Sequence, residues 1–239
     1  MQETTQTCRW HVYPTPQALK DAALLLITHS AQTAIAARGA FHIVLAGGNT
    51  PRAIYAGLST MDTAWQAWHI YYGDERCLPP DDPARNSVMV NTAWLHNVAI
   101  PSAQIHSIPA ERGAATAAEA YAAVLQRVGV FDLVVLGLGE DGHTASLFPG
   151  HVWGSAENSP PALPINDAPL PYTERVSLSA HRLSLARQVV FVVSGTSKQH
   201  AVALWQSHAN IPAATITPAN GVDILADQSA MTPTTPTAQ

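Results

Sequence analysis

Residues 137–149 combine three glycines, two acids and a histidine directly after an apolar run. The segment reads Gly-Leu-Gly-Glu-Asp-Gly-His-Thr-Ala-Ser-Leu-Phe-Pro and follows residues 131–136. Glycines permit a sharp turn whose backbone N–H groups point toward a ligand. A histidine there can exchange protons near neutral pH, and an acid two residues earlier can orient its ring. We expect His143 as a general base with Asp141 as its partner, at or near the start of a short helix. A structural histidine is the alternative.

A second glycine-rich segment, Gly47-Gly48-Asn49-Thr50-Pro51, also follows an apolar run. Paired glycines let the backbone approach an anion closely, and a following helix N-terminus offers unpaired N–H groups. Thr50 and Pro51 fit the N-cap and the first position of that helix. We expect Gly47, Gly48, Asn49 and Thr50 to bind a phosphate, although a tight strand–helix turn explains the same residues.

Two cations, Arg76 and Lys198, also follow apolar runs, as the two glycine-rich segments do. Arg76 comes just after the apolar run 68–72, and Lys198 just after the run 189–193. A guanidinium can bind a phosphate or carboxylate with two parallel hydrogen bonds. A lysine in the first turn of a helix is disfavoured by the helix dipole, and a bound anion would offset that effect. We expect both cations to contact an anionic ligand. A solvated charged loop and a plain surface lysine are the alternatives.

Further polar residues surround Arg76. Asp74 and Glu75 can position that arginine or a sugar hydroxyl. Downstream, Arg85-Asn86-Ser87 precedes an expected helix. The spacing favours a helix cap over a ligand contact for this tripeptide.

The sequence predicts neither a metal nor an organic cofactor. Its eleven histidines lack the close spacing of a zinc site, and Cys8 and Cys77 have no cysteine partner nearby. A Gly-x-x-x-x-Gly-Lys-[Ser/Thr] nucleotide loop is absent from the sequence. Gly137-x-Gly139-x-x-Gly142 has the spacing of a dinucleotide-binding fingerprint. Such a site also needs an acidic residue on a following strand, and the sequence has none there.

The composition is typical of a globular protein and excludes some partners. The 239 residues are 47% hydrophobic, and the formal net charge is −5. Domains that bind nucleic acid are usually clearly basic, so we expect no nucleic-acid partner. An apolar run of roughly 18–20 residues, as a membrane span needs, is absent, and residues 1–10 do not resemble a signal peptide. We therefore expect a cytoplasmic protein without a membrane partner.

Apolar runs alternate with amphipathic or alanine-rich stretches along the chain. We expect strands at 41–46, 68–72, 131–136, 175–178 and 189–193, and helices at 16–37, 51–58, 86–96, 113–128 and 197–207. Nearly continuous apolar strands between helices are typical of a mostly parallel sheet with helices on both faces, which binds ligands at the carboxyl ends of its strands. We predict one Rossmann-like α/β domain over residues 1–230, a long loop at 159–171 and a disordered tail at 231–239.

The polar segments, in this order, resemble the 6-phosphogluconolactonase family over about residues 16–230. The most specific match is 131–149. The other matching segments are 45–51, 73–77, 175–178, Gly195-x-x-Lys198 and Gly221–Asp227, the last resembling the family's closing helix.

This resemblance implies hydrolysis of 6-phospho-D-glucono-1,5-lactone without a cofactor, by a monomer or small homo-oligomer. It implies His143 as the base that activates water. Arg76, Lys198 and the amides around Gly48 would hold the phosphate, and a turn amide such as that of Gly139 would stabilise the oxyanion.

Two other functions share much of this pattern. Glucosamine-6-phosphate deaminases of the same superfamily are expected to carry an Asp-Glu-Tyr-like element and Asn-Glu-Pro after the histidine, so Asp74-Glu75-Arg76 and residues 144–149 favour the lactonase branch. A non-catalytic sugar-phosphate-binding protein would not need the intact Asp141-Gly142-His143. Asn49 departs from the serine that is frequent in the family, but its amide can still donate to a phosphate. Residues 85–87 depart from the family pattern as well, which weakens the inference of a substrate contact for Asn86.

Overall fold

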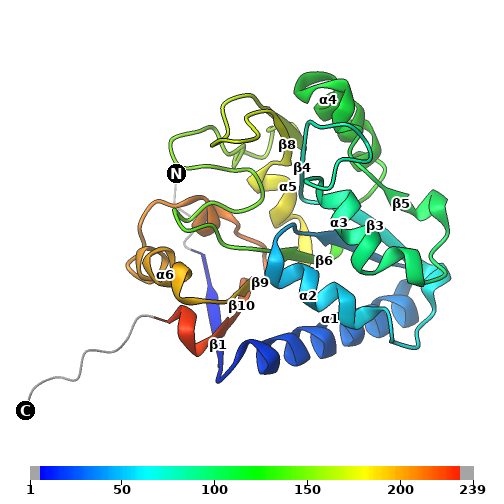
Figure 1. Ribbon diagram of the computed structural model, residues 1–239, viewed down its shortest axis with the longest axis horizontal. Coiled ribbons are helices and arrows are strands. Elements are labelled where there is room, and N and C mark those ends of the chain that lie inside the picture. Colours follow the sequence, from blue (N-terminus) through cyan, green and yellow to red (C-terminus); the bar gives the residue numbers. More distant parts are fainter. Residues whose placement is uncertain (1–5, 232–239) are drawn as a thin grey trace, which may run out of the picture.

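The structure, a computed structural model, describes residues 6–231, and its strands form two sheets (Figure 1). The larger sheet is parallel throughout, in the order β1-β10-β9-β6-β2-β3-β5. Its strands are β1 Cys8–Tyr13, β2 Phe41–Leu45, β3 Trp68–Tyr72, β5 Ile105–His106, β6 Phe131–Leu136, β9 Ala186–Val193 and β10 Val222–Asp227.

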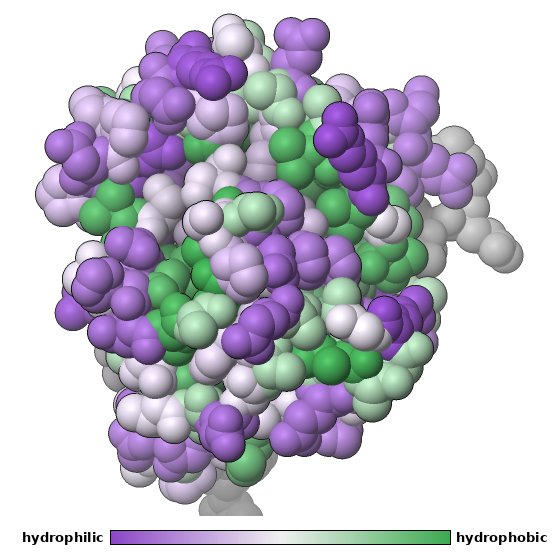
Figure 2. Space-filling model, turned by 90° about the vertical axis from the view of Figure 1, so that its right-hand side faces the viewer, coloured by the Kyte–Doolittle hydropathy of each residue, from purple (hydrophilic) through white to green (hydrophobic). Residues whose placement is uncertain are grey.

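Helices cover this sheet on both sides. In Figure 1, α1 and α2 lie on one side of the strands and α5 lies on the other. The helices are α1 Pro16–Arg38, α2 Asn49–Leu58, α3 Asn86–Ala93, α4 Ala114–Leu125, α5 Ala180–Ser184 and α6 Gln199–Gln206. The predicted class, a mostly parallel α/β sheet between helices, is therefore confirmed. The face on the β5 side mixes hydrophilic side chains with smaller apolar groups (Figure 2).

The longest helix shows why the sequence pattern was informative. The Thr15 side chain accepts the N–H of Ala18 at 3.1 Å and Pro16 follows it, while Gly39, in a left-handed conformation with φ of 76°, ends the helix. The buried residues are Leu19, Ala23, Ile27, Ala31 and Ala34. They recur every three or four residues, so they form one stripe that packs against the sheet.

The central strands are buried along their length. All six residues of β6 are buried, as expected for a strand between two helical layers. Aromatic rings fill the space beside β2 and β3. Phe41 meets Trp68 edge-on at 4.7 Å, and Trp68 meets Trp94 at 5.7 Å between ring centroids. These contacts pack β2 and β3 together at their first residues, Phe41 and Trp68.

A second, antiparallel sheet corrects two sequence-based predictions. It contains β4 Asp74–Arg76, β8 Arg175–Leu178 and β7 Ala162–Ile165. The predicted loop 159–171 therefore contains a strand, and β8 does not join the parallel sheet. Strands this short leave little periodicity to detect, and β4 is polar because it carries cavity side chains.

The two ends of the chain supply another correction. Residues Val222–Asp227 form β10 and not a closing helix; β10 pairs with β9 on one side and with β1 on the other. The strand β1 was not predicted. It lies at the sheet edge, where its partly exposed residues show no continuous apolar run. The predicted tail lies outside the described residues beyond position 231.

The strand order gathers the polar segments at one edge of the sheet. β9, β6, β2 and β3 are consecutive neighbours in the sheet, and one of the polar segments follows each of these strands in the chain. The chain proceeds from β2 toward β3 in one direction and from β6 toward β9 in the other. A crevice forms where such directions diverge, outside the carboxyl ends of the strands.

Candidate active site

A cavity of about 550 Å³ opens at this crevice. Of the residues expected at the site, it is lined by Gly47, Gly48, Arg76, Gly139, Asp141, His143 and Lys198. The further polar residues that line it are Asp74, Asn86, Glu140, Thr144 and Arg175. The structure thus brings together groups from several separate chain segments, as the strand order requires.

His143 and Asp141 form a hydrogen-bonded pair at the cavity wall. The Nδ1 atom of His143 lies 2.6 Å from Oδ1 of Asp141, which also accepts the backbone N–H of His143 at 3.1 Å. Burial raises the pKa of Asp141, but these hydrogen bonds and the imidazole charge outweigh it and leave that pKa below its usual range. Because Nδ1 is occupied, Nε2 is the ring nitrogen left for a water molecule or substrate.

The loop after β6 differs from the expected short helix. Residues 137–150 form turns closed by a bridge between Thr144 and Leu147, so the histidine lies on an irregular loop. A Cβ on Gly139 would lie 2.0 Å from Nδ1 of His143. Gly142 has a φ of 87°. Gly139 is therefore required for the ring to lie against the loop, and Gly142 for a left-handed turn packed against Ile211.

The expected role of the Gly139 amide is wrong. Its N–H donates to the carbonyl oxygen of His143 at 2.7 Å. An N–H already bonded within the loop is not available to a developing oxyanion. Gly139 contributes through its missing side chain instead.

The glycine turn after β2 lies opposite this loop. Gly48 has a φ of 102° and precedes α2, whose first residue is Asn49. The expected N-cap role of Thr50 is therefore wrong, because the helix begins one residue before it. Asn49 and Thr50 are not among the described residues that line the cavity, so their side chains are not placed on its wall. The backbone N–H groups of both residues lie in the first turn of α2, where helical N–H groups have no partner within the helix.

Three cations surround the other side of the cavity. Arg76 and Arg175 face each other across paired strands, because they are register partners in β4 and β8. Lys198 ends the 3-10 turn that precedes α6. Among the described residues, none of these three cations lies within 4 Å of a carboxylate oxygen. Their charge is thus available to an anion.

Arg175 was not among the expected site residues, although its segment formed part of the resemblance. Its Nε donates to the carbonyl oxygen of Tyr172 at 3.0 Å, and its guanidinium lies 5.2 Å from the centroid of the Phe148 ring. Burial lowers the pKa of Arg175; the Asp74 carboxylate opposes this shift and the Arg76 charge adds to it. Only the pairing of β8 with β4 brings Arg175 to the cavity, and that pairing spans about a hundred residues.

The loop that carries Lys198 is held by a buried carboxylate at the end of β10. Asp227 accepts hydrogen bonds from the Ser194 hydroxyl and from the N–H of Gly195, the latter at 3.3 Å. Burial raises the pKa of Asp227, but its hydrogen bonds, led by that of Ser194, outweigh burial and lower it. This carboxylate therefore ties the turn before Lys198 to the neighbouring strand.

Residues 6–231 contain no group of three or more His, Cys, Asp or Glu side chains arranged to hold a metal ion. Within these residues, no helix is both long and apolar enough to cross a membrane.

Comparison with known proteins decides the family. Residues 14–225 match the family model described as glucosamine-6-phosphate isomerases/6-phosphogluconolactonase. The chain belongs to this family. It is 39% identical over 200 residues to a 6-phosphogluconolactonase of Synechocystis sp., an alignment that covers 78% of this chain and 80% of the relative.

Solved structures of this family share the fold. The 6-phosphogluconolactonase of Trypanosoma brucei superposes with a TM-score of 0.82 at 27% identity, covering 95% of this chain and 98% of that one. A monomeric glucosamine-6-phosphate deaminase superposes with a TM-score of 0.80 at 18% identity, covering 93% and 98%. The fold alone therefore does not separate the two activities.

Proposed function

We propose that this chain hydrolyses 6-phospho-D-glucono-1,5-lactone to 6-phospho-D-gluconate. The observation that carries the proposal is a His–Asp pair and three cations on the walls of one cavity, none of which has a carboxylate within 4 Å among residues 6–231. The names of relatives such as the Synechocystis protein support the same substrate.

The proposed reaction needs one proton carrier. As the water oxygen attacks C1, Nε2 of His143 takes a proton from it, and the carbonyl becomes an oxyanion. When this tetrahedral intermediate collapses, the bond between C1 and the ring oxygen breaks, and His143 returns the proton to that oxygen, which becomes the C5 hydroxyl. The Asp141 carboxylate stabilises the imidazolium formed in between. General-base help of this kind accelerates reactions by about 10²–10⁴-fold.

The cations explain how an acidic protein holds an anionic substrate. We propose that Arg76, Arg175 and Lys198 bind the phosphate, together with backbone N–H groups at the start of α2 near Gly48. Local charge determines this binding, whereas the net charge of −5 acts mainly on the encounter rate. With the phosphate anchored there, C1 of the sugar is presented to His143.

The assembly and the location of the enzyme belong to the same proposal. We propose a monomer or a small homo-oligomer that acts in the cytoplasm. Cys8 and Cys77 are both free thiols, which fits a reducing compartment. Light scattering on the purified protein would give the oligomeric state.

The test is hydrolysis of freshly generated lactone, measured above its spontaneous rate. Glucosamine 6-phosphate is assayed in parallel for ammonia release, because a family member of the same fold is a deaminase. Faster lactone opening without ammonia release supports the proposal. Ammonia release without lactone opening would assign the deaminase reaction, and phosphate-ester binding without either turnover would assign a binding protein.

A further inference from the structure

Glu75 lies directly behind the cavity and takes no part in the proposed chemistry. In β4, successive side chains point to opposite sides, so Asp74 and Arg76 line the cavity while Glu75 points into the protein. Glu75 is fully buried. A buried carboxylate is costly unless every oxygen has a partner, so its contacts indicate what it does.

Its two oxygens accept backbone N–H groups from two different elements. Oε1 accepts the N–H of Arg76 at 2.8 Å and the N–H of Asn86 at 2.7 Å, and Oε2 accepts the N–H of Ser87 at 2.8 Å. Asn86 and Ser87 are the first residues of α3, whose N-cap residue makes no side-chain capping bond. Glu75 therefore caps α3 from a neighbouring strand, where its charge also suits the helix dipole.

An arginine compensates this buried charge. Nε of Arg85 lies 3.5 Å from Oε2 of Glu75, and Nη1 of the same guanidinium lies 3.1 Å from Oε2 of Glu111. Nη2 donates to the carbonyl oxygen of Ile108 at 2.8 Å. The pair is thus held by the segment before α4 and does not reach the cavity.

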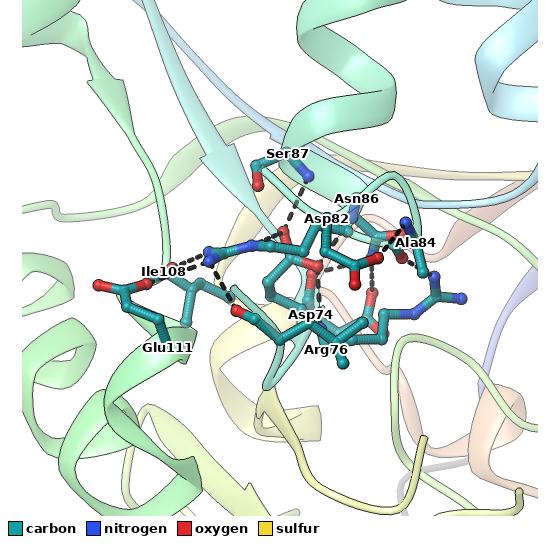
Figure 3. A network of polar contacts seen from close by, with 11 residues as sticks. Asp74, Arg76, Asp82, Ala84, Asn86, Ser87, Ile108 and Glu111 are labelled. Atoms are coloured by element: carbon teal, nitrogen blue, oxygen red, sulfur yellow. Dashed lines mark hydrogen bonds and ion pairs between the residues drawn. The ribbon is translucent and has the colours of Figure 1, made fainter. Parts of the chain in front are cut away.

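The residues on either side of Glu75 bind the same segment. The Asn86 side chain donates to the Asp74 carboxylate at 2.9 Å, and Nη1 of Arg76 donates to the carbonyl oxygen of Ala84 (Figure 3). A Cβ on Gly47 would lie 2.0 Å from Oδ1 of Asn86, so the amide is pressed against the glycine turn. Glu75 adds a direct link between two backbone positions, because its Oε1 accepts the N–H groups of both Arg76 and Asn86.

We infer that Glu75 is a positioning residue for phosphate binding: by joining β4 to α3, it sets the place of Arg76 on the cavity wall. This rests on the proposed function only for the identity of the substrate. His143 itself is oriented by Asp141 within the loop after β6, and that loop meets β4 at Asp74, through the Ser146 hydroxyl, and not at Glu75. Loss of Glu75 should therefore weaken substrate binding and leave the chemical step largely intact.

The test compares Glu75→Gln and Glu75→Asp with the wild type. Glutamine keeps the size of the side chain but one oxygen becomes an NH₂ group, which faces backbone N–H donors and cannot accept from them. We expect the KM for the lactone and the Kd for inorganic phosphate each to rise about tenfold, with kcat within about threefold of the wild type. Aspartate keeps the charge opposite Arg85 and withdraws the carboxylate by one methylene, so it should raise the same two constants.

Asp132→Asn is the matched control. Asp132 is also buried, accepts the N–H of His42 at 2.8 Å and pairs with Arg38, but it lies near the opposite end of β6 from the cavity. It should lower the thermal midpoint without changing KM or the phosphate Kd. If the Glu75 variants lower the midpoint to the same extent with both constants unchanged, the inference is wrong.

The phosphate measurement separates this inference from the proposed function. If the wild type does not open the lactone, the function fails, but a weaker phosphate Kd in the Glu75 variants still supports the positioning role. If Glu75→Gln does not fold, Glu75→Asp decides alone: an unchanged phosphate Kd in that variant would overturn the inference. A fall in kcat with KM unchanged would also overturn it, because Glu75 would then act on the His143 side of the cavity.

Discussion

At the scale of single residues, the account depends on one hydrogen bond, between Nδ1 of His143 and Asp141. It selects the tautomer of the neutral ring, leaving Nε2 as the proton acceptor. It also places a negative charge where the imidazolium forms during the reaction. The lowered pKa of Asp141 keeps this carboxylate ionised throughout the neutral range.

Asp141→Asn tests that bond. Asparagine can occupy the same space, but it lacks the charge that stabilises the imidazolium. We expect kcat for lactone hydrolysis to fall about 100-fold or more, with KM nearly unchanged because the phosphate contacts remain. Steady-state kinetics provide the measurement, and a kcat within twofold of the wild type would show that Asp141 has no part in the chemistry.

Gly139→Ala tests the packing of the histidine. The added Cβ would overlap the His143 ring at Nδ1, so the ring must leave its place beside Asp141. We expect kcat to fall at least tenfold. Gly129→Ala is the control, since a Cβ there meets nothing within 4 Å. Equal kcat values for the two variants would contradict the role given to Gly139.

At the scale of elements, neighbouring strands bring together a row of histidines far from the cavity. His42 on β2 stacks on His69 of β3 at 4.6 Å between ring centroids, and His69 stacks on His106 of β5 at 5.9 Å. Burial lowers the pKa of all three, and for His42 and His106 the neighbouring rings lower it further.

Charged and aromatic neighbours complete the surroundings of these rings. For His42, the Asp132 carboxylate opposes the downward pKa shift and the Arg38 charge adds to it. Tyr71 stacks on His106 at 4.5 Å. Half-buried rings this close are stable side by side only while they are neutral.

A pH dependence of stability follows. The pKa of each ring is lower in the folded chain than in the unfolded chain. As the pH falls, the unfolded chain therefore binds protons first, near the ordinary histidine pKa of about 6.5. The free energy of unfolding should therefore be highest above that pH and fall as the pH is lowered through it toward 5. Urea unfolding at pH 8 and pH 5 measures this loss.

His69→Gln removes the middle ring and should reduce the difference in unfolding free energy between the two pH values. His200→Gln, at an exposed histidine of α6, should leave the difference as in the wild type. An undiminished difference in His69→Gln would show that the stacked row is not its source.

At the scale of the whole molecule, the sequence predicted the parallel sheet well, because each central strand and helix can be recognised from the apolar pattern of its own residues. The expected strands at β2, β3 and β6 match the structure to within one residue, since each is a buried apolar run. The closeness of Asp141 and His143 was also predictable, because the two residues lie two positions apart in sequence and their contact needs only a short loop.

What the sequence did not predict depends on contacts between distant segments. β1 is recognisable only beside β10, with which it pairs in register from Cys8 and Val222 onward. Arg175 reaches the cavity only because β8 pairs with β4. The sequence placed Glu75 beside Arg76, but its contacts with the backbone N–H groups of Asn86 and Ser87 exist only because α3 packs against β4. Such pairings are set by the packing of the whole chain, which local periodicity does not contain.

The central claim is that His143 opens the lactone in a cavity whose cations hold the phosphate. The most direct measurement compares wild type and His143→Ala in hydrolysis of fresh 6-phospho-D-glucono-1,5-lactone, with inorganic phosphate binding measured on both. We predict that the wild type alone exceeds the spontaneous rate and that both proteins bind phosphate with similar affinity. Equal acceleration by both proteins, or by neither, would contradict the account.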